Sequence, residues 1–69
     1  MPSLQEVQGT PQELTLGKTV YEFHSRWPIV MAANEKAGDL AMMGDRVQVV
    51  KTRKDNGQFE YLVYIHKMF

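Results

Sequence analysis

Two β-prone apolar runs near the end of the chain flank a short turn, and this feature restricts the fold most strongly. Val47, Val49 and Val50 precede the turn, and the run from Phe59 to Ile65 follows it. Between them lies Lys54-Asp55-Asn56-Gly57, in which asparagine and glycine tolerate the positive φ of tight hairpin turns. The sequence therefore predicts a β-hairpin from roughly Asp45 to Phe69.

Two registers are open to this hairpin. A two-residue Asn56-Gly57 turn would pair Val49 with Tyr64, whereas a three-residue loop with Gly57 as a left-handed bulge would pair Val49 with Val63. Only the three-residue loop gathers one set of apolar residues on a single face, because a slip of one residue moves side chains to the other face. We therefore predict the three-residue loop, with this shared face: Val47, Val49, Tyr61, Val63 and Ile65.

The second face of the hairpin also carries apolar residues: Val50, Leu62, Tyr64 and Met68. Either another layer of the same chain covers them, or they form an exposed patch. An exposed apolar patch on a small domain usually marks a contact with a partner. These four residues and Trp27, which can serve as an interface anchor, are the predicted partner-binding residues.

A chain of 69 residues forms one small domain with a marginal core. It has no cysteine, which excludes disulfides and thiolate-bound zinc or iron–sulfur sites. His24 and His66 would need carboxylates to complete a metal site, and we expect no metal and no cofactor. There is no apolar run near 18 residues and no signal-peptide pattern at the N-terminus, so we expect a soluble, cytoplasmic protein without membrane contact.

Residues 1–13 are polar and contain glycine and proline, which predicts a flexible N-terminal arm before a domain formed by residues 14–69. One pattern disagrees, since Thr10-Pro11-Gln12-Glu13 has the form of a helix capping box. Residues 14–27 then allow two interpretations. A helix would align Leu16, Val20, Phe23 and Trp27, but Gly17 would cost it about 1 kcal/mol. A strand beginning at Lys18, with alternating side chains, is favoured.

Residues 28–43 are predicted to form a helix, with Ser25 as the N-terminal cap and Pro28 in the first turn. Apolar residues recur there at spacings of three and four: Val30, Ala33, Ala37, Leu40 and Ala41. Gly38 weakens the middle and is an alternative end of the helix, while Gly44 suits the left-handed position after it.

These elements predict an α+β domain in which one helix packs on a three-stranded sheet that ends in the C-terminal hairpin. The alternative is a small SH3-like barrel, because Gly44-Asp45-Arg46-Val47 resembles the start of a strand in such barrels. A winged-helix arrangement comes third, since the basic hairpin tip resembles a wing.

No catalytic motif is present: the sequence lacks G-x-S-x-G, H-E-x-x-H and a phosphate-binding glycine loop. Ser25 follows His24, but neighbours in a strand point to opposite faces, so we do not expect a nucleophile–base pair. The protein is therefore predicted not to be an enzyme. The leading hypothesis is a protein-binding module, an inhibitor or regulatory subunit that masks the surface of another protein or of its own copy. Its methionines suit either core filling or an adaptable binding face: Met31, Met42, Met43 and Met68.

The competing hypothesis is a nucleic-acid-binding protein. Lys51, Arg53 and Lys54 cluster near the hairpin tip, and Tyr61 follows on the next strand. Cations bind phosphates and aromatic rings stack on bases, so this combination fits a nucleic-acid contact. The whole chain has eight basic and eight acidic residues, however, and this balance argues against a protein that depends on phosphate contacts.

Overall fold

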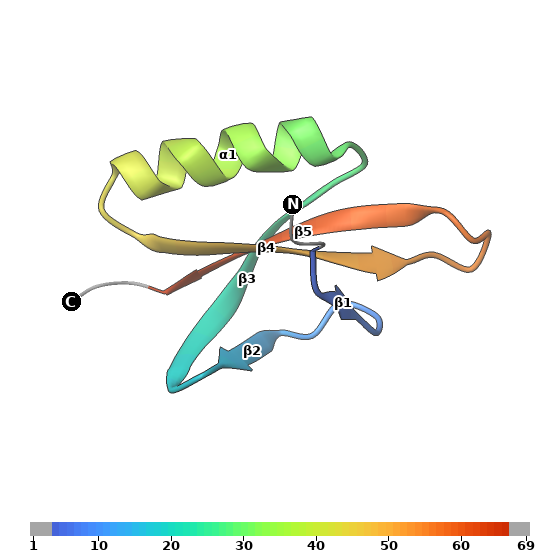
Figure 1. Cartoon of the computed structure of the whole chain (residues 1–69), viewed down its shortest axis with the longest axis horizontal. Coiled ribbons are helices and arrows are strands. Elements are labelled where there is room, and N and C mark those ends of the chain that lie inside the picture. Colours follow the sequence, from blue (N-terminus) through green and yellow to red (C-terminus); the bar gives the residue numbers. More distant parts are fainter. Residues whose placement is uncertain (1–3, 67–69) are drawn as a thin grey trace.

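The computed structural model describes residues 4–66, which form one α-helix and a curled five-stranded sheet (Figure 1). The strands lie in the order β1-β4-β5-β3-β2, with β1 parallel to β4 and the other pairs antiparallel. The predicted α+β class is confirmed. The elements are β1 (Glu6–Val7), β2 (Glu13–Leu16), β3 (Thr19–Trp27), α1 (Val30–Met42), β4 (Arg46–Arg53) and β5 (Phe59–His66).

The sheet has five strands instead of the predicted three because the N-terminal segment (residues 4–16) supplies two of them. Leu14 and Leu16 alternate with polar residues, as in a half-buried strand, and β2 pairs with β3 across the two-residue turn Gly17-Lys18. Gly17 has a φ of +64°, and glycine at the first turn position is typical of a type II′ hairpin. The glycine that weakened the helical interpretation of this stretch therefore belongs to a turn.

The stretch predicted as a loose arm holds a defined place at the opposite edge of the sheet, where β1 pairs with β4. The backbone N–H of Lys51 donates to the carbonyl of Gln5 at 2.9 Å. The capping-box pattern at Thr10 does not begin a helix, because an irregular segment with a bend at Gln12 and then β2 follow that residue. Residues 1–3 of the predicted arm lie outside the described residues.

Strand β3 confirms the favoured interpretation of residues 19–27 and contains a β-bulge at His24. Phe23 pairs with Tyr64 and Ser25 pairs with Val63, so two residues of β5 oppose three of β3. The extra residue shifts the alternation of side chains, so that those after the bulge point to the opposite face of the sheet from the one they would otherwise occupy. Tyr21 and Phe23 consequently pack on one face of the sheet, whereas Trp27 packs on the other.

Helix α1 begins at Val30 and ends at Met42, within the predicted range, and it continues through Gly38. The predicted cap is wrong: Ile29 occupies the N-cap position without a side-chain hydrogen bond, because Ser25 is still part of β3. The predicted left-handed end is confirmed at Gly44, whose φ is +100°. Hydrogen bonds from Gly44 N–H to Ala41 and from Asp45 N–H to Leu40 complete a Schellman motif. Within residues 4–66, no helix is long and apolar enough to cross a membrane.

The predicted hairpin register is confirmed, with Val49 opposite Val63 and Val47 opposite Ile65. Gly57 has a φ of +86°, and its N–H donates to the carbonyl of Lys54 at 2.9 Å. The loop therefore has three residues, and the hairpin projects beyond the N-terminal end of α1 in Figure 1.

The sheet buries a core on each face. The helix-side core lies under α1, and its buried members are Ala33, Leu40, Val63 and Ile65. The opposite-face core consists of Tyr21, Val50, Leu62 and Tyr64, against which the N-terminal segment packs Val7, Leu14 and Leu16. The outer strands β1 and β2 do not pair with each other among the described residues, so the sheet stays open and does not form the alternative SH3-like barrel. The single helix of residues 4–66 also leaves no helix pair for a winged-helix arrangement.

Candidate binding surfaces

The apolar second face of the hairpin is covered by the chain itself. Val50, Leu62 and Tyr64, three of the predicted partner-binding residues, have at most 1% of their surface exposed. The N-terminal segment supplies the covering layer, so these side chains stabilise the fold and offer no surface to a partner in this structure. Trp27 is half-buried at the border of the helix-side core, and Met68 lies outside the described residues.

Two side-chain hydrogen bonds, one from Tyr64 and one from Arg26, form a polar clasp that holds the N-terminal segment against this face. The hydroxyl of Tyr64 donates to the carbonyl of Pro11 at 2.6 Å, and Arg26 donates from Nη2 to Thr10 Oγ1 at 2.7 Å. Arg26 also lies 3.9 Å from a carboxylate oxygen of Glu60. Burial raises the pKa of the Tyr64 phenol, and the nearby Arg26 guanidinium opposes that shift. The clasp gives hydrogen-bond partners to polar groups next to an apolar core, so we interpret it as a contribution to the stability of the fold and not as a binding site.

The basic hairpin end (Lys51, Arg53 and Lys54) is the second predicted surface. Lys51 Nζ and Arg53 Cζ each lie 4.7 Å from the centre of the Phe59 ring, in cation–π contact. Lys51 pairs with Tyr61 across the hairpin, so both predicted nucleic-acid-contact strands meet here. Sequence reasoning missed the ring of Phe59, although its position opposite Arg53 follows from the predicted register.

Acidic groups reduce the charge of this end. Arg53 Nε lies 3.9 Å from Glu6 of β1, and both side chains are largely exposed. An open depression of about 290 Å³ adjoins them; its lining residues are Glu6, Val7, Gln8, Gly9, Arg53 and Lys54. The two cations that line it make the depression suitable for an anionic group, while Glu6 opposes one.

Large apolar side chains are exposed at both ends of α1. Ile29 and Met31 are 60% and 74% exposed near its N-terminus, and Met42 and Met43 are 89% and 78% exposed at its C-terminus. The sequence allowed the methionines to be either core filling or an adaptable binding face, and Met31, Met42 and Met43 lie on the surface. The exposure of Met31 and Met42 follows from the helical spacing, because residues 31 and 42 fall opposite Ala33 and Leu40 on a helix with 3.6 residues per turn.

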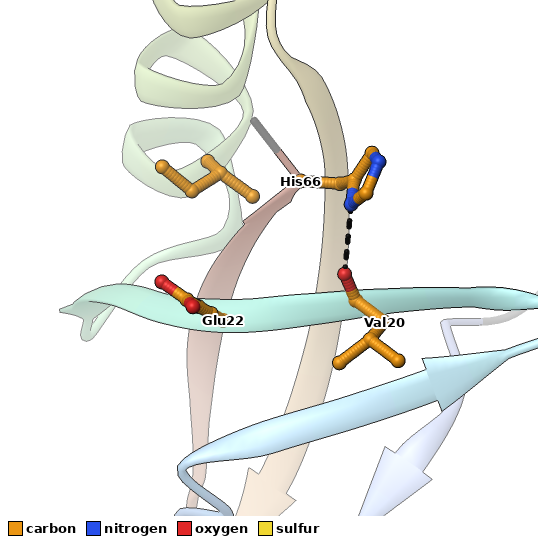
Figure 2. Close-up of a pocket in the computed structure, with 4 residues that line it drawn as sticks. Val20, Glu22 and His66 are labelled. Carbon is orange, nitrogen blue, oxygen red and sulfur yellow. Dashed lines mark hydrogen bonds between the residues drawn. The ribbon is translucent and has the colours of Figure 1, made fainter. Parts of the chain in front are cut away.

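An open depression of about 260 Å³ lies between β3 and the end of β5. Its lining residues are Val20, Glu22, Ile65 and His66, whose side chains are drawn in Figure 2. Nδ1 of His66 lies 3.0 Å from the carbonyl of Val20. Because a carbonyl only accepts, Nδ1 carries the proton of this hydrogen bond. Glu22 and His66 are two candidate metal ligands, but residues 4–66 contain no group of three His, Asp or Glu side chains able to hold a metal.

The bulge brings His24 and Ser25 together, contrary to the sequence expectation. His24 Nδ1 lies 3.0 Å from Ser25 Oγ, which also accepts a hydrogen bond from Trp27 Nε1 at 2.8 Å. The serine hydroxyl donates to the imidazole only in the tautomer whose Nδ1 carries no hydrogen, and in that tautomer the pair makes the first contact needed for a nucleophile–base pair. The hydrogen bonds formed by these three residues include no carboxylate to orient His24. The cluster fits a polar support for the bulge better than a catalytic site.

Comparisons with protein-family models, curated proteins and solved structures give no match to this chain.

Proposed function

We propose that the protein is a small binding module that acts on another protein by covering part of its surface, as an inhibitor or regulatory subunit does. The observation that carries the proposal is the exposure of Ile29, Met31, Met42 and Met43 at the ends of α1. Both faces of the sheet have their own cores, so these side chains are not needed to fill a core of the described fold. Methionine adapts to irregular surfaces and is frequent at binding faces.

The side chains that line the two open depressions fit a protein that binds its partner better than one that catalyses a reaction. Among the described residues, neither depression is lined by a serine, threonine or cysteine, and the His24–Ser25–Trp27 cluster lies outside their lining residues. The proposed site is therefore the surface of α1.

The test is affinity capture from cells of the source organism with the intact protein and with the double variant Met31→Glu/Met42→Glu. We expect a protein that co-purifies stoichiometrically with the wild-type chain to be lost with the double variant. The matched control is Thr15→Glu/Gln48→Glu, which places the same two new charges on exposed positions of β2 and β4. Equal capture by all three proteins would exclude α1 as the site, and no captured protein would contradict the proposal.

A nucleic-acid-binding function is the second candidate, supported by the placement of Lys51 and Arg53 over one side of the exposed hairpin end. It predicts that affinity for an oligonucleotide falls steeply as salt is raised, because bound cations displace counterions from phosphates. Fluorescence anisotropy at low salt, with the Lys51→Gln/Arg53→Gln variant and an Arg46→Gln control, separates the two candidates. An anisotropy that does not change at any protein concentration would eliminate this function.

A further inference from the structure

The outer helix face (Met31, Glu35, Gly38 and Met42) forms a continuous stripe on α1. Successive members are four, three and four residues apart, so they align on one side of a helix with 3.6 residues per turn. All four are exposed, and the buried Ala33 and Leu40 lie on the opposite side. A large apolar residue therefore occupies each end of a surface that faces away from the core.

Gly38 in the middle of this stripe has no role in the fold that requires glycine. It is absent from the glycines with positive φ, and a Cβ built on it meets no atom within 4 Å. Glycine inside a helix is less favourable than alanine. A residue without a side chain is useful at this place if another backbone approaches the helix closely. Gly38 thus leaves a shallow gap between two methionines.

The net charge in and beside the stripe is negative, because Glu35 in the stripe and Asp39 beside it outnumber Lys36, which lies on the same flank of α1 and is partly buried. Glu35 and Asp39 are exposed and adjacent on the surface of α1, since residues four apart are neighbours on a helix. The last turn of the helix has no basic residue to offset them. A partner that packs on the stripe therefore gains from lysine or arginine residues at its border.

This charge disfavours a second copy of the chain as the occupant. Antiparallel pairing about a twofold axis between residues 36 and 37 would match Met31 with Met42 of the second copy. The same operation gathers Glu35 and Asp39 of both copies on one flank, where four carboxylates face only the two Lys36 side chains and the net charge is repulsive. The stripe is symmetric in its apolar residues and self-repulsive in its charges.

We propose that the outer helix face is the docking site for a basic amphipathic helix of a partner protein. Apolar residues of that helix would pack between Met31 and Met42 over Gly38, and its cations would pair with Glu35 and Asp39. This inference rests on the proposed protein-binding function and assigns the chemistry of the partner.

The probe is a fluorescein-labelled 14-residue amphipathic helical peptide of leucine and lysine, titrated against the full chain by fluorescence anisotropy. We expect Gly38→Leu and Glu35→Lys each to raise the Kd about tenfold or more, since they fill the gap or reverse the charge. Glu13→Lys is the matched control, because it makes the same charge reversal on exposed β2 and should leave the Kd within about twofold.

Gly38→Ala separates a docking role from a merely structural one. Alanine favours the helix over glycine, so the Tm should rise by about 4–8 °C whether or not a partner binds. Docking at Gly38 predicts that peptide affinity falls while the Tm rises. Unchanged affinity in Gly38→Ala and Gly38→Leu would overturn the inference.

Further outcomes distinguish this inference from the proposed function. Equal losses with Glu35→Lys and Glu13→Lys would mean general charge attraction and overturn it. A dimer seen by sedimentation that Gly38→Leu dissociates would identify a second copy as the occupant and also overturn it. If a cellular partner is captured through Met31 and Met42 but the peptide fails to bind, the proposed function stands and the basic helix is wrong.

Discussion

The two faces of the sheet are covered in different ways. On one face, α1 provides a continuous layer and buries Ala33 and Leu40 against β5. On the other face, β1, the loop of residues 8–12 and β2 cover Leu62 and Tyr64. The polar clasp, formed by Tyr64 and Arg26, holds this loop in place. Packing of apolar side chains holds the helix on the first face. Backbone pairing of β1 with β4 and of β2 with β3 holds the second cover, and the polar clasp adds side-chain hydrogen bonds to it. A small chain without disulfides can therefore complete a second core with an irregular segment.

The largest expected effect comes from truncating one leucine in each core. Leu62→Ala and Leu40→Ala remove the same atoms from buried sites, and each should lower the free energy of unfolding by about 2–5 kcal/mol. Urea denaturation gives the loss. Hydrogen exchange then tests the comparison: Leu62→Ala should accelerate exchange in β1 and β2, and Leu40→Ala in α1. Acceleration of the same amides by both variants would show that the two covers open together.

Tyr64→Phe tests the clasp alone. It removes the hydrogen bond to Pro11 and keeps the ring, so we expect a loss of about 0.5–1.5 kcal/mol in unfolding free energy. Tyr61→Phe is the control, because the hydroxyl of Tyr61 forms no hydrogen bond to the part of the chain that the structure describes. Equal losses in the two variants would show that the hydrogen bond from Tyr64 to Pro11 does not help to hold the N-terminal segment on the sheet.

The same residue predicts a dependence on alkaline pH. The pKa of Tyr64 is raised above 10.0 in the folded protein by burial, so the folded state keeps the phenolic proton more strongly than the unfolded chain. Its contribution to stability is complete below pH 10 and is lost as pH rises through the folded pKa. Denaturation between pH 9 and 11 should show a smaller decline for Tyr64→Phe than for wild type. Parallel declines would contradict this assignment.

Arg26→Met should have the smallest effect. The side chain is partly exposed, and its ion pair with Glu60 has a separation of 3.9 Å, so we expect a loss of about 0.2–1 kcal/mol. Arg46→Met, an exposed substitution at the start of β4, is the matched control for lost charge. A loss larger than that of Tyr64→Phe would make Arg26 the main fastening of the N-terminal segment.

The face covered by the helix was largely predictable from sequence, and the other was not. The turn at Gly57 and the alternation around it give the hairpin register, because a shift by one residue would expose the valines. Residues 4–13 have no such pattern: β1 is two residues long, and its parallel pairing with β4 joins positions far apart in the chain. Sequence reasoning therefore grouped Val50, Leu62 and Tyr64 correctly but assigned their cover to a partner.

The candidate sites follow the same division. The basic hairpin end was predictable because Lys51, Arg53 and Tyr61 lie within the hairpin, where the register places them. The contact between His24 and Ser25 was not, since nothing in the local sequence marks residue 24 as the extra residue of a bulge. The outer helix face is intermediate, because its spacing is visible in the sequence but its exposure depends on which side of α1 meets the sheet.

The bulge at His24 makes the number of residues in β3 more important than their identity at that point. His24 is exposed, so most substitutions there should leave the fold intact. Deleting it would restore simple alternation and turn Trp27 away from the helix-side core, towards the face that holds Tyr21 and Phe23. Homologous chains should therefore vary freely in the residue at this position while keeping the spacing between Phe23 and Trp27, and insertions and deletions should collect in the turns.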